Sequence, residues 1–113
     1  MFDCRCLPNP GKFEEYQVLT GLDTSVQEWL EVKEETAMFL NHVKGTLELS
    51  VKRYITRDFE RLMVSCGCTG GQHRSVYVAE KLRKHFAGYP GLSVQLTHIE
   101  QSFWPNSTQV QEH

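Results

Sequence analysis

A short apolar run that leads into a glycine-rich loop and then into a helix is the feature that most constrains the fold. Residues 61–67, "RLMVSCG", are bounded by charge and glycine, which is typical of a buried strand. Three glycines lie at or just beyond its end, and apolar residues then recur every three or four positions as far as about Ala87. This spacing predicts a helix. A strand, a tight loop and a helix in this order predict an α/β layer.

The rest of the chain supplies further elements for the same layer. Residues 2–7 and 92–98 alternate between apolar and polar side chains, which predicts two more strands. Helices are predicted over about 24–30 and 33–55, the second on a stripe of leucine and valine. The order of the elements predicts a small single α/β domain with a mainly parallel sheet flanked by helices.

Length and composition limit the class of protein. The chain has 113 residues, enough for one domain, and its net charge of −2 argues against the whole molecule attracting nucleic acid or an anionic membrane. It has no apolar run of about 18 residues and no leader in which a basic segment precedes an apolar one, so we expect a cytoplasmic protein without membrane contact.

We expect the domain to span 2–100 and residues 101–113, which lack periodicity, to form a flexible tail. Trp29 is expected in the core and Trp104 partly exposed.

Four cysteines form two Cys-x-Cys pairs, Cys4 with Cys6 and Cys66 with Cys68. Structural zinc sites usually separate their paired cysteines by about two to four residues on a turn, rather than by one residue in a strand. We therefore expect free thiols, with no metal and no cofactor.

The glycine-rich loop predicts an anion-binding site. Such a loop presents backbone N–H groups and the positive end of a helix dipole at one point, and its glycines allow a ligand to approach closely. Arg74 falls in the first helical turn, where its planar guanidinium suits a phosphate, and His73 offers a second donor. The loop also follows the carboxyl end of a strand, where open α/β sheets bind ligands.

Cys68 leaves a second chemistry open. "CTGGQHRS" (68–75) fits the Cys-x2-Gly-x2-Arg-Ser pattern of protein tyrosine phosphatases, in which a cysteine thiolate attacks a cradled phosphorus. Gly67 stands where that signature has a histidine, and none of the three aspartates lies in a recognisable acid loop. The loop is thus predicted to bind an anion without catalysing a reaction. The alternative is a phosphatase that uses Cys68 and Arg74.

Three segments together resemble a known family. "FDCRCLPNPG", "LTGLD" and "GCTGGQHRSVYVAE" are similar, in this order, to the signatures of the C-terminal domain of RapZ, the RNase adapter protein, and the similarity runs from about residue 2 to 98. The resemblance implies a fold likened to a phosphofructokinase subdomain and assembly into homo-oligomers. It also implies binding of small regulatory RNA and sensing of an amino-sugar phosphate, glucosamine-6-phosphate.

The resemblance also implies which residues bind the sugar phosphate. They come from the third and first motifs: Cys68, Thr69, Gly70, Gly71, Gln72, His73 and Arg74, with Asp3, Arg5 and Asn9. Gly11 stands where the RNA-regulating members have a histidine, so one ligand contact is expected to be lost. No Gly-x4-Gly-Lys-Ser/Thr motif occurs, so we expect a standalone or excised domain to which nucleotide hydrolysis cannot be assigned.

The basic residues bear on RNA binding. Members that bind RNA end in a Lys/Arg cluster, whereas this chain has no lysine or arginine after position 84. Because affinity for a phosphate backbone depends on such cations, its absence is expected to weaken RNA binding. The candidate RNA patch consists of Lys52, Arg53, Arg57, Lys81, Arg83 and Lys84.

Overall fold

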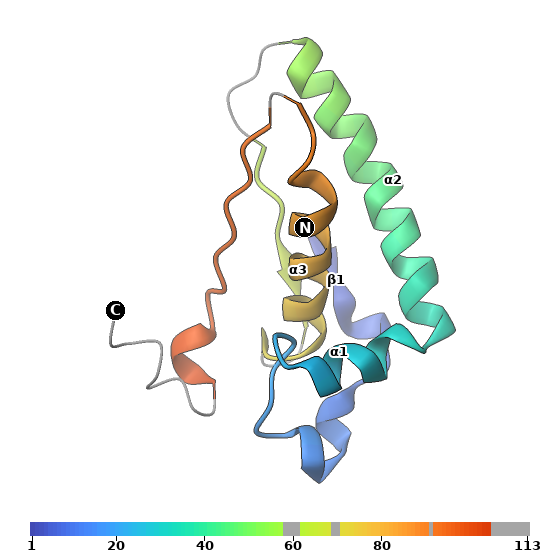
Figure 1. The fold of residues 1–113 in the computed structure, drawn as a ribbon, viewed down its shortest axis with the longest axis vertical. Helices are drawn as coiled ribbons and strands as arrows, with labels where there is room; N and C mark the ends of the chain where they lie inside the picture. Colours follow the sequence, from blue (N-terminus) through green and yellow to red (C-terminus); the bar gives the residue numbers. More distant parts are fainter. Residues whose placement is uncertain (58–61, 69–70, 91, 105–113) are drawn as a thin grey trace.

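The computed structural model describes residues 1–57, 62–68, 71–90 and 92–104 (Figure 1). The strands and helices are β1 (Phe2–Asp3), α1 (Thr24–Glu31), α2 (Glu34–Thr56), β2 (Cys66–Gly67) and α3 (Arg74–Phe86), with short 3-10 turns η1 (Cys4–Cys6), η2 (Pro10–Lys12), η3 (Glu14–Tyr16) and η5 (Gln101–Phe103). The prediction of a mixed α/β domain with a parallel sheet is confirmed. The likeness to a phosphofructokinase subdomain stays a prediction.

The sheet is smaller than the sequence predicts. β1 pairs in parallel with β2, with Phe2 opposite Cys66 and Asp3 opposite Gly67. The predicted strand over 2–7 is wrong beyond Asp3, because the Asp3 carboxylate accepts the backbone N–H of Arg5 at 3.0 Å and caps the 3-10 turn η1. The predicted strand over 61–67 is confirmed only at its end, and residue 61 lies outside the described residues.

The predicted third strand over 92–98 is also wrong. Within the described ranges these residues pair with no strand. Their side chains nevertheless alternate between half-buried and exposed, and Leu92 and Val94 pack against the core. An extended segment with one face on the core produces the same alternation as a paired strand, so the pattern does not reveal whether a hydrogen-bonding neighbour exists.

The three predicted helices are confirmed to within a few residues. The apolar stripe of α2 is buried at Leu40, Val43, Leu47 and Val51. It faces a core that includes Val26 and Leu30 of α1, Val78, Leu82 and Phe86 of α3, and Cys4 and Leu7 of the first motif. Figure 1 shows α2 and α3 as the two long elements of the domain, with α1 at one end of α2. None of the helices in the described ranges is long and apolar enough to cross a membrane.

The sequence predicts the burial of one tryptophan correctly and that of the other incorrectly. Trp29 is half-buried and packs against the core, as expected. Trp104 is only 6% exposed, so the prediction of partial exposure is wrong. Its indole N–H donates to the carbonyl oxygen of Gly71 at 2.9 Å. Within the predicted tail, Trp104 therefore packs on the domain, whereas residues 105–113 lie outside the described residues.

Candidate functional site

Cys68 lies between the end of β2 and the start of α3. Its Sγ atom is 3.2 Å from the Ser75 hydroxyl and accepts the Ser75 backbone N–H at 3.3 Å. Burial raises the pKa of the Cys68 thiol, but the Ser75 hydrogen bonds and the nearby Arg74 charge outweigh it, so the pKa lies below its ordinary value. The surroundings of this sulfur thus favour negative charge. Thr69 and Gly70, also predicted for the site, lie outside the described residues.

Two cavities of about 400 Å³ each open beside Cys68. The first is lined by Met1, Asp3, Arg5, Gly67 and Cys68. The second is lined by Cys66, Gly67, Cys68, Gly71, Ser75, Ile99 and Glu100. Each volume falls within the range of about 300 to 1,000 Å³ that small-molecule sites occupy. The structure therefore brings Asp3, Arg5, Cys68 and Gly71, four of the predicted site residues, to one surface at the strand ends.

Asp3 and Arg5 form a bidentate ion pair on the wall of the first cavity. The guanidinium Nη2 donates to Asp3 Oδ2 at 2.7 Å, and Nε lies 3.0 Å from both carboxylate oxygens. These hydrogen bonds lower the pKa of Asp3 to about 2 and raise the pKa of Arg5. Both groups are therefore charged at neutral pH, and the cavity presents a carboxylate and a guanidinium side by side.

Arg74 has a different placement from the one the loop motif suggests. Its side chain is buried, and Nη1 donates to the backbone carbonyls of Arg5 at 2.9 Å and of Leu7 at 3.0 Å. It does not line either of the two cavities. Arg74 thus fastens the first motif to the start of α3.

Gln72 and His73 attach the segment that precedes α1 to the start of α3 in the same way. Gln72 Nε2 donates to the carbonyls of Gln17 at 2.8 Å and Leu19 at 2.7 Å. The buried His73 ring places Nε2 at 2.7 Å from the Tyr16 carbonyl oxygen, so this nitrogen acts as a donor there. Neither side chain lines the two cavities beside Cys68.

Asn9 lies near His73 rather than beside Cys68. Its Oδ1 accepts the Gly11 N–H at 2.9 Å and caps η2. A Cβ atom at Gly11 would lie 3.5 Å from the His73 ring, which shows how closely this turn approaches α3. The first and third motifs therefore meet at two places, one around Cys68 and one around His73.

Sequence reasoning missed the residues that follow the extended segment. Ile99 and Glu100 line the second cavity, and Trp104 contacts Gly71. No periodic pattern marks residues 99–104, and the signal that could have identified them is a tryptophan that follows Phe103 in a largely polar segment.

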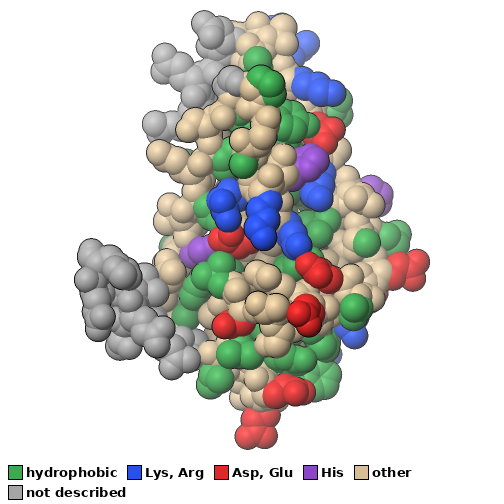
Figure 2. Space-filling model, in the orientation of Figure 1, with side chains coloured by type: hydrophobic (Ala, Val, Ile, Leu, Met, Phe, Trp, Pro, Cys, Tyr) green, Lys and Arg blue, Asp and Glu red, His purple; other side chains and the backbone are tan. Residues whose placement is uncertain are grey.

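The predicted basic patch is interleaved with acidic groups. Figure 2 shows Lys and Arg side chains gathered over α3, with acidic side chains directly beside them. Lys81 Nζ pairs with Glu31 at 2.7 Å, and Arg83 pairs with Glu80 at 2.9 Å. These ion pairs neutralise part of the positive charge that the α3 residues bring to the patch.

The thiols and acidic groups form no metal centre within the described ranges. All four cysteines are free thiols. No group of three or more histidine, cysteine, aspartate or glutamate side chains there could hold a metal ion.

Comparison with known proteins gives one consistent family. The sequence model of the RapZ C-terminal domain matches residues 1–102. A nucleotide-binding protein of Geobacter sulfurreducens is 44% identical over 101 residues, covering 89% of this chain and 35% of that protein. A nucleotide-binding protein of Lactobacillus acidophilus is 41% identical over 103 residues, covering 90% of this chain and 34% of that protein. The chain thus spans about one third of the length of these curated relatives.

Proposed function

Because the chain belongs to the RapZ C-terminal domain family, we propose that it is a regulatory module that binds a phosphorylated metabolite beside Cys68. The ligand class is an amino-sugar phosphate such as glucosamine-6-phosphate. We assign no nucleotide site to this chain, because it lacks the Gly-x4-Gly-Lys-Ser/Thr motif.

The observation that carries this proposal is the charged pair on the first cavity. Asp3 and Arg5 present opposite charges on the same wall as Cys68, next to the start of α3. An amino-sugar phosphate likewise carries an ammonium and a phosphate group. A guanidinium has five N–H donors, and the Asp3 pair engages Nε and Nη2, so Arg5 keeps capacity for an anion. The helix dipole of α3 adds to this attraction.

Titration calorimetry with glucosamine-6-phosphate, glucosamine and inorganic phosphate tests the proposal. Arg5→Gln should weaken binding of the phosphosugar, because it removes the cation from the cavity wall. Arg53→Gln on α2 is the matched control, since Arg53 is an exposed arginine outside both cavities. Arg5→Gln is a better test than Arg74→Ala, because Arg74 holds backbone carbonyls of the fold. If the wild type binds none of the three compounds, the proposal is refuted.

A Cys68-dependent phosphatase is the second candidate, favoured by the contact between the Cys68 sulfur and Ser75 and by the lowered pKa of the thiol. Its weakness is that Arg74 is buried against two backbone carbonyls and lines neither cavity, so the arginine does not reach a phosphate beside Cys68 in this arrangement. Cys68→Ser separates the two candidates. It should leave phosphosugar binding intact, whereas it would abolish hydrolysis of an aryl phosphate if the chain were a phosphatase.

RNA binding and assembly into a homo-oligomer are further parts of the proposal. The support for RNA binding is the family together with the six basic residues on α2, at its C-terminal end and on α3. Binding of a short RNA should fall steeply with salt and should weaken in Lys84→Gln, because each phosphate contact releases counterions. Light scattering on the purified chain tests the oligomeric state.

A further inference from the structure

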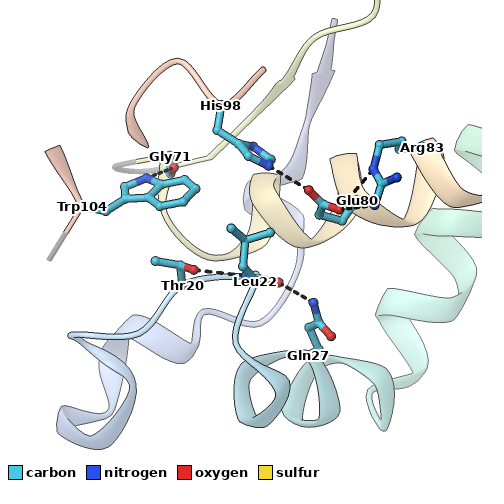
Figure 3. Close-up of polar contacts among 9 residues, drawn as sticks. Thr20, Leu22, Gln27, Gly71, Glu80, Arg83, His98 and Trp104 are labelled. Carbon is cyan, nitrogen blue, oxygen red and sulfur yellow. Dashed lines mark hydrogen bonds and ion pairs between the residues drawn. The ribbon is translucent and has the colours of Figure 1, made fainter. Parts of the chain in front are cut away.

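Residues 98–104, which we call the C-terminal strap, contact Gly71 of the glycine-rich loop. Figure 3 shows the Trp104 side chain beside Gly71, with its indole N–H aimed at the Gly71 carbonyl. The nitrogen and the oxygen are 2.9 Å apart, and the tryptophan is 6% exposed. The hydrogen bond between the buried indole N–H and the loop carbonyl is a specific contact, because burying an indole N–H without an acceptor costs free energy.

The other end of the strap is held by α3. His98 Nε2 lies 3.0 Å from Glu80 Oε2, and the same carboxylate accepts from Arg83 at 2.9 Å (Figure 3). The His98 and Glu80 side chains are mostly buried. The His98 ring also packs against the Trp104 ring, with centroids 5.4 Å apart. The strap is thus attached at both ends, once to the helix and once to the loop.

The middle of the strap lies directly over Gly71. This glycine has a φ of 61°, and a Cβ atom there would come within 2.8 Å of Glu100 Cγ. Ile99 and Glu100 also form part of the wall of the second cavity, together with Cys68 and Ser75. The strap therefore borders the second cavity, which shares Gly67 and Cys68 with the first, and it also holds the Gly71 carbonyl.

The contact with Trp104 sets the orientation of one peptide group in the loop. In a planar trans peptide the C=O of one residue and the N–H of the next point in opposite directions. A Gly71 carbonyl held by the indole therefore directs the N–H of Gln72 away from the strap. The same hydrogen bond holds the Gly71 carbonyl oxygen, which would repel an anion if this oxygen turned into the loop.

We propose that Trp104 is a positioning residue for the anion site, holding the Gly71 peptide in the orientation that accepts a negatively charged ligand. This inference rests on the proposed function. It extends the site beyond residue 102, where the match to the family ends.

Trp104→Phe tests the inference, because it keeps an aromatic ring against His98 and removes only the indole N–H and part of the ring. Calorimetry with glucosamine-6-phosphate should show binding about 3- to 10-fold weaker than the wild type, the range that one lost hydrogen bond produces. An unchanged dissociation constant would overturn the inference while leaving the proposed function in place. Absence of binding by the wild type would overturn both.

Tryptophan fluorescence gives a readout that does not require altering the strap. Trp29 and Trp104 are the only tryptophans, so Trp29→Phe leaves Trp104 as the single fluorophore. Adding glucosamine-6-phosphate should change the Trp104 emission with the same midpoint that calorimetry gives for this variant. If the variant binds the sugar phosphate in the calorimeter and its emission does not change, Trp104 does not sense the site and the inference fails.

Discussion

Gly21→Ala should destabilise the protein strongly, because Gly21 lets the "LTGLD" segment touch the backbone of α3. A Cβ atom at this position would lie 2.5 Å from the His73 carbonyl oxygen, 2.5 Å from the Tyr77 nitrogen and 2.9 Å from Val76 Cβ. The Gly21 N–H also donates to the Gln72 carbonyl at 2.9 Å. The second motif is thus pressed against the helix that follows the glycine-rich loop.

The size of the effect follows from these contacts. Two of the three clashes are with backbone atoms, about 0.9 Å closer than the 3.4 Å at which ordinary contact begins, and a helix backbone cannot rotate out of the way. Overpacking of this kind costs about 1 to 3 kcal/mol, and weakening the Gly21 hydrogen bond adds about 1 kcal/mol. We expect a loss near 3 kcal/mol out of a stability of about 5 to 15 kcal/mol. At about 4 °C per kcal/mol, the melting temperature should fall by about 12 °C.

Urea and thermal unfolding followed by circular dichroism measure this loss. Gly45→Ala is the matched control, because Gly45 lies inside α2 and a Cβ atom there meets nothing within 4 Å. That variant should gain about 0.5 to 1 kcal/mol from the higher helix propensity of alanine. If Gly21→Ala costs less than about 1 kcal/mol, the contact between the second motif and α3 does not contribute as the structure indicates.

Three further predictions concern the charged groups of the site. Arg74→Ala should lower the free energy of unfolding in urea by about 2 to 4 kcal/mol, because it leaves two backbone carbonyls without their donor; a loss below about 1 kcal/mol would contradict this role. The rate of Cys68 alkylation, followed by peptide mass spectrometry, should rise with a midpoint below the ordinary thiol pKa, and Ser75→Ala should move that midpoint to higher pH; an unmoved midpoint would exclude the serine as the cause. Because the pKa of Asp3 is lowered from 3.8 to about 2, its pair with Arg5 should stabilise the fold above pH 3.8 and cease to do so as the pH falls through about 2. The difference in urea midpoint between wild type and Asp3→Asn should shrink over that interval, and a constant difference would refute the assignment.

Local patterns were sufficient to predict the helices and insufficient to predict the strands. The stripe from Leu40 to Val51 is buried as its spacing indicates, because helical hydrogen bonds are made within the segment itself. Strands need a partner, and a sequence pattern does not name one. The segment 92–98 alternates without pairing, and the Asp3 side chain ends β1 by bonding to its own neighbour.

At the candidate site, too, local patterns predict some features and not others. Asp3, Arg5, Cys68 and Gly71, which the motifs predict for the site, lie around the two cavities beside Cys68, because the parallel pairing of β1 with β2 brings both strand ends together. Motif reasoning did not foresee how the buried polar side chains would be used. A guanidinium in a short motif can serve a ligand or the backbone, and only the position of the first motif against α3 decides that Arg74 donates to Leu7.

By itself, the sequence determined the family, the three helices and the presence of a glycine-rich loop between a strand and a helix. These features depend on local propensity, spacing and the order of motifs along the chain. Tertiary structure alone decided that the second motif packs on α3 through Gly21, that Gln72, His73 and Arg74 hold distant backbone carbonyls, and that Trp104 reaches Gly71. Each of these contacts joins residues far apart in the sequence, and a donor's partner is chosen by whichever carbonyl the folded chain brings within hydrogen-bonding distance.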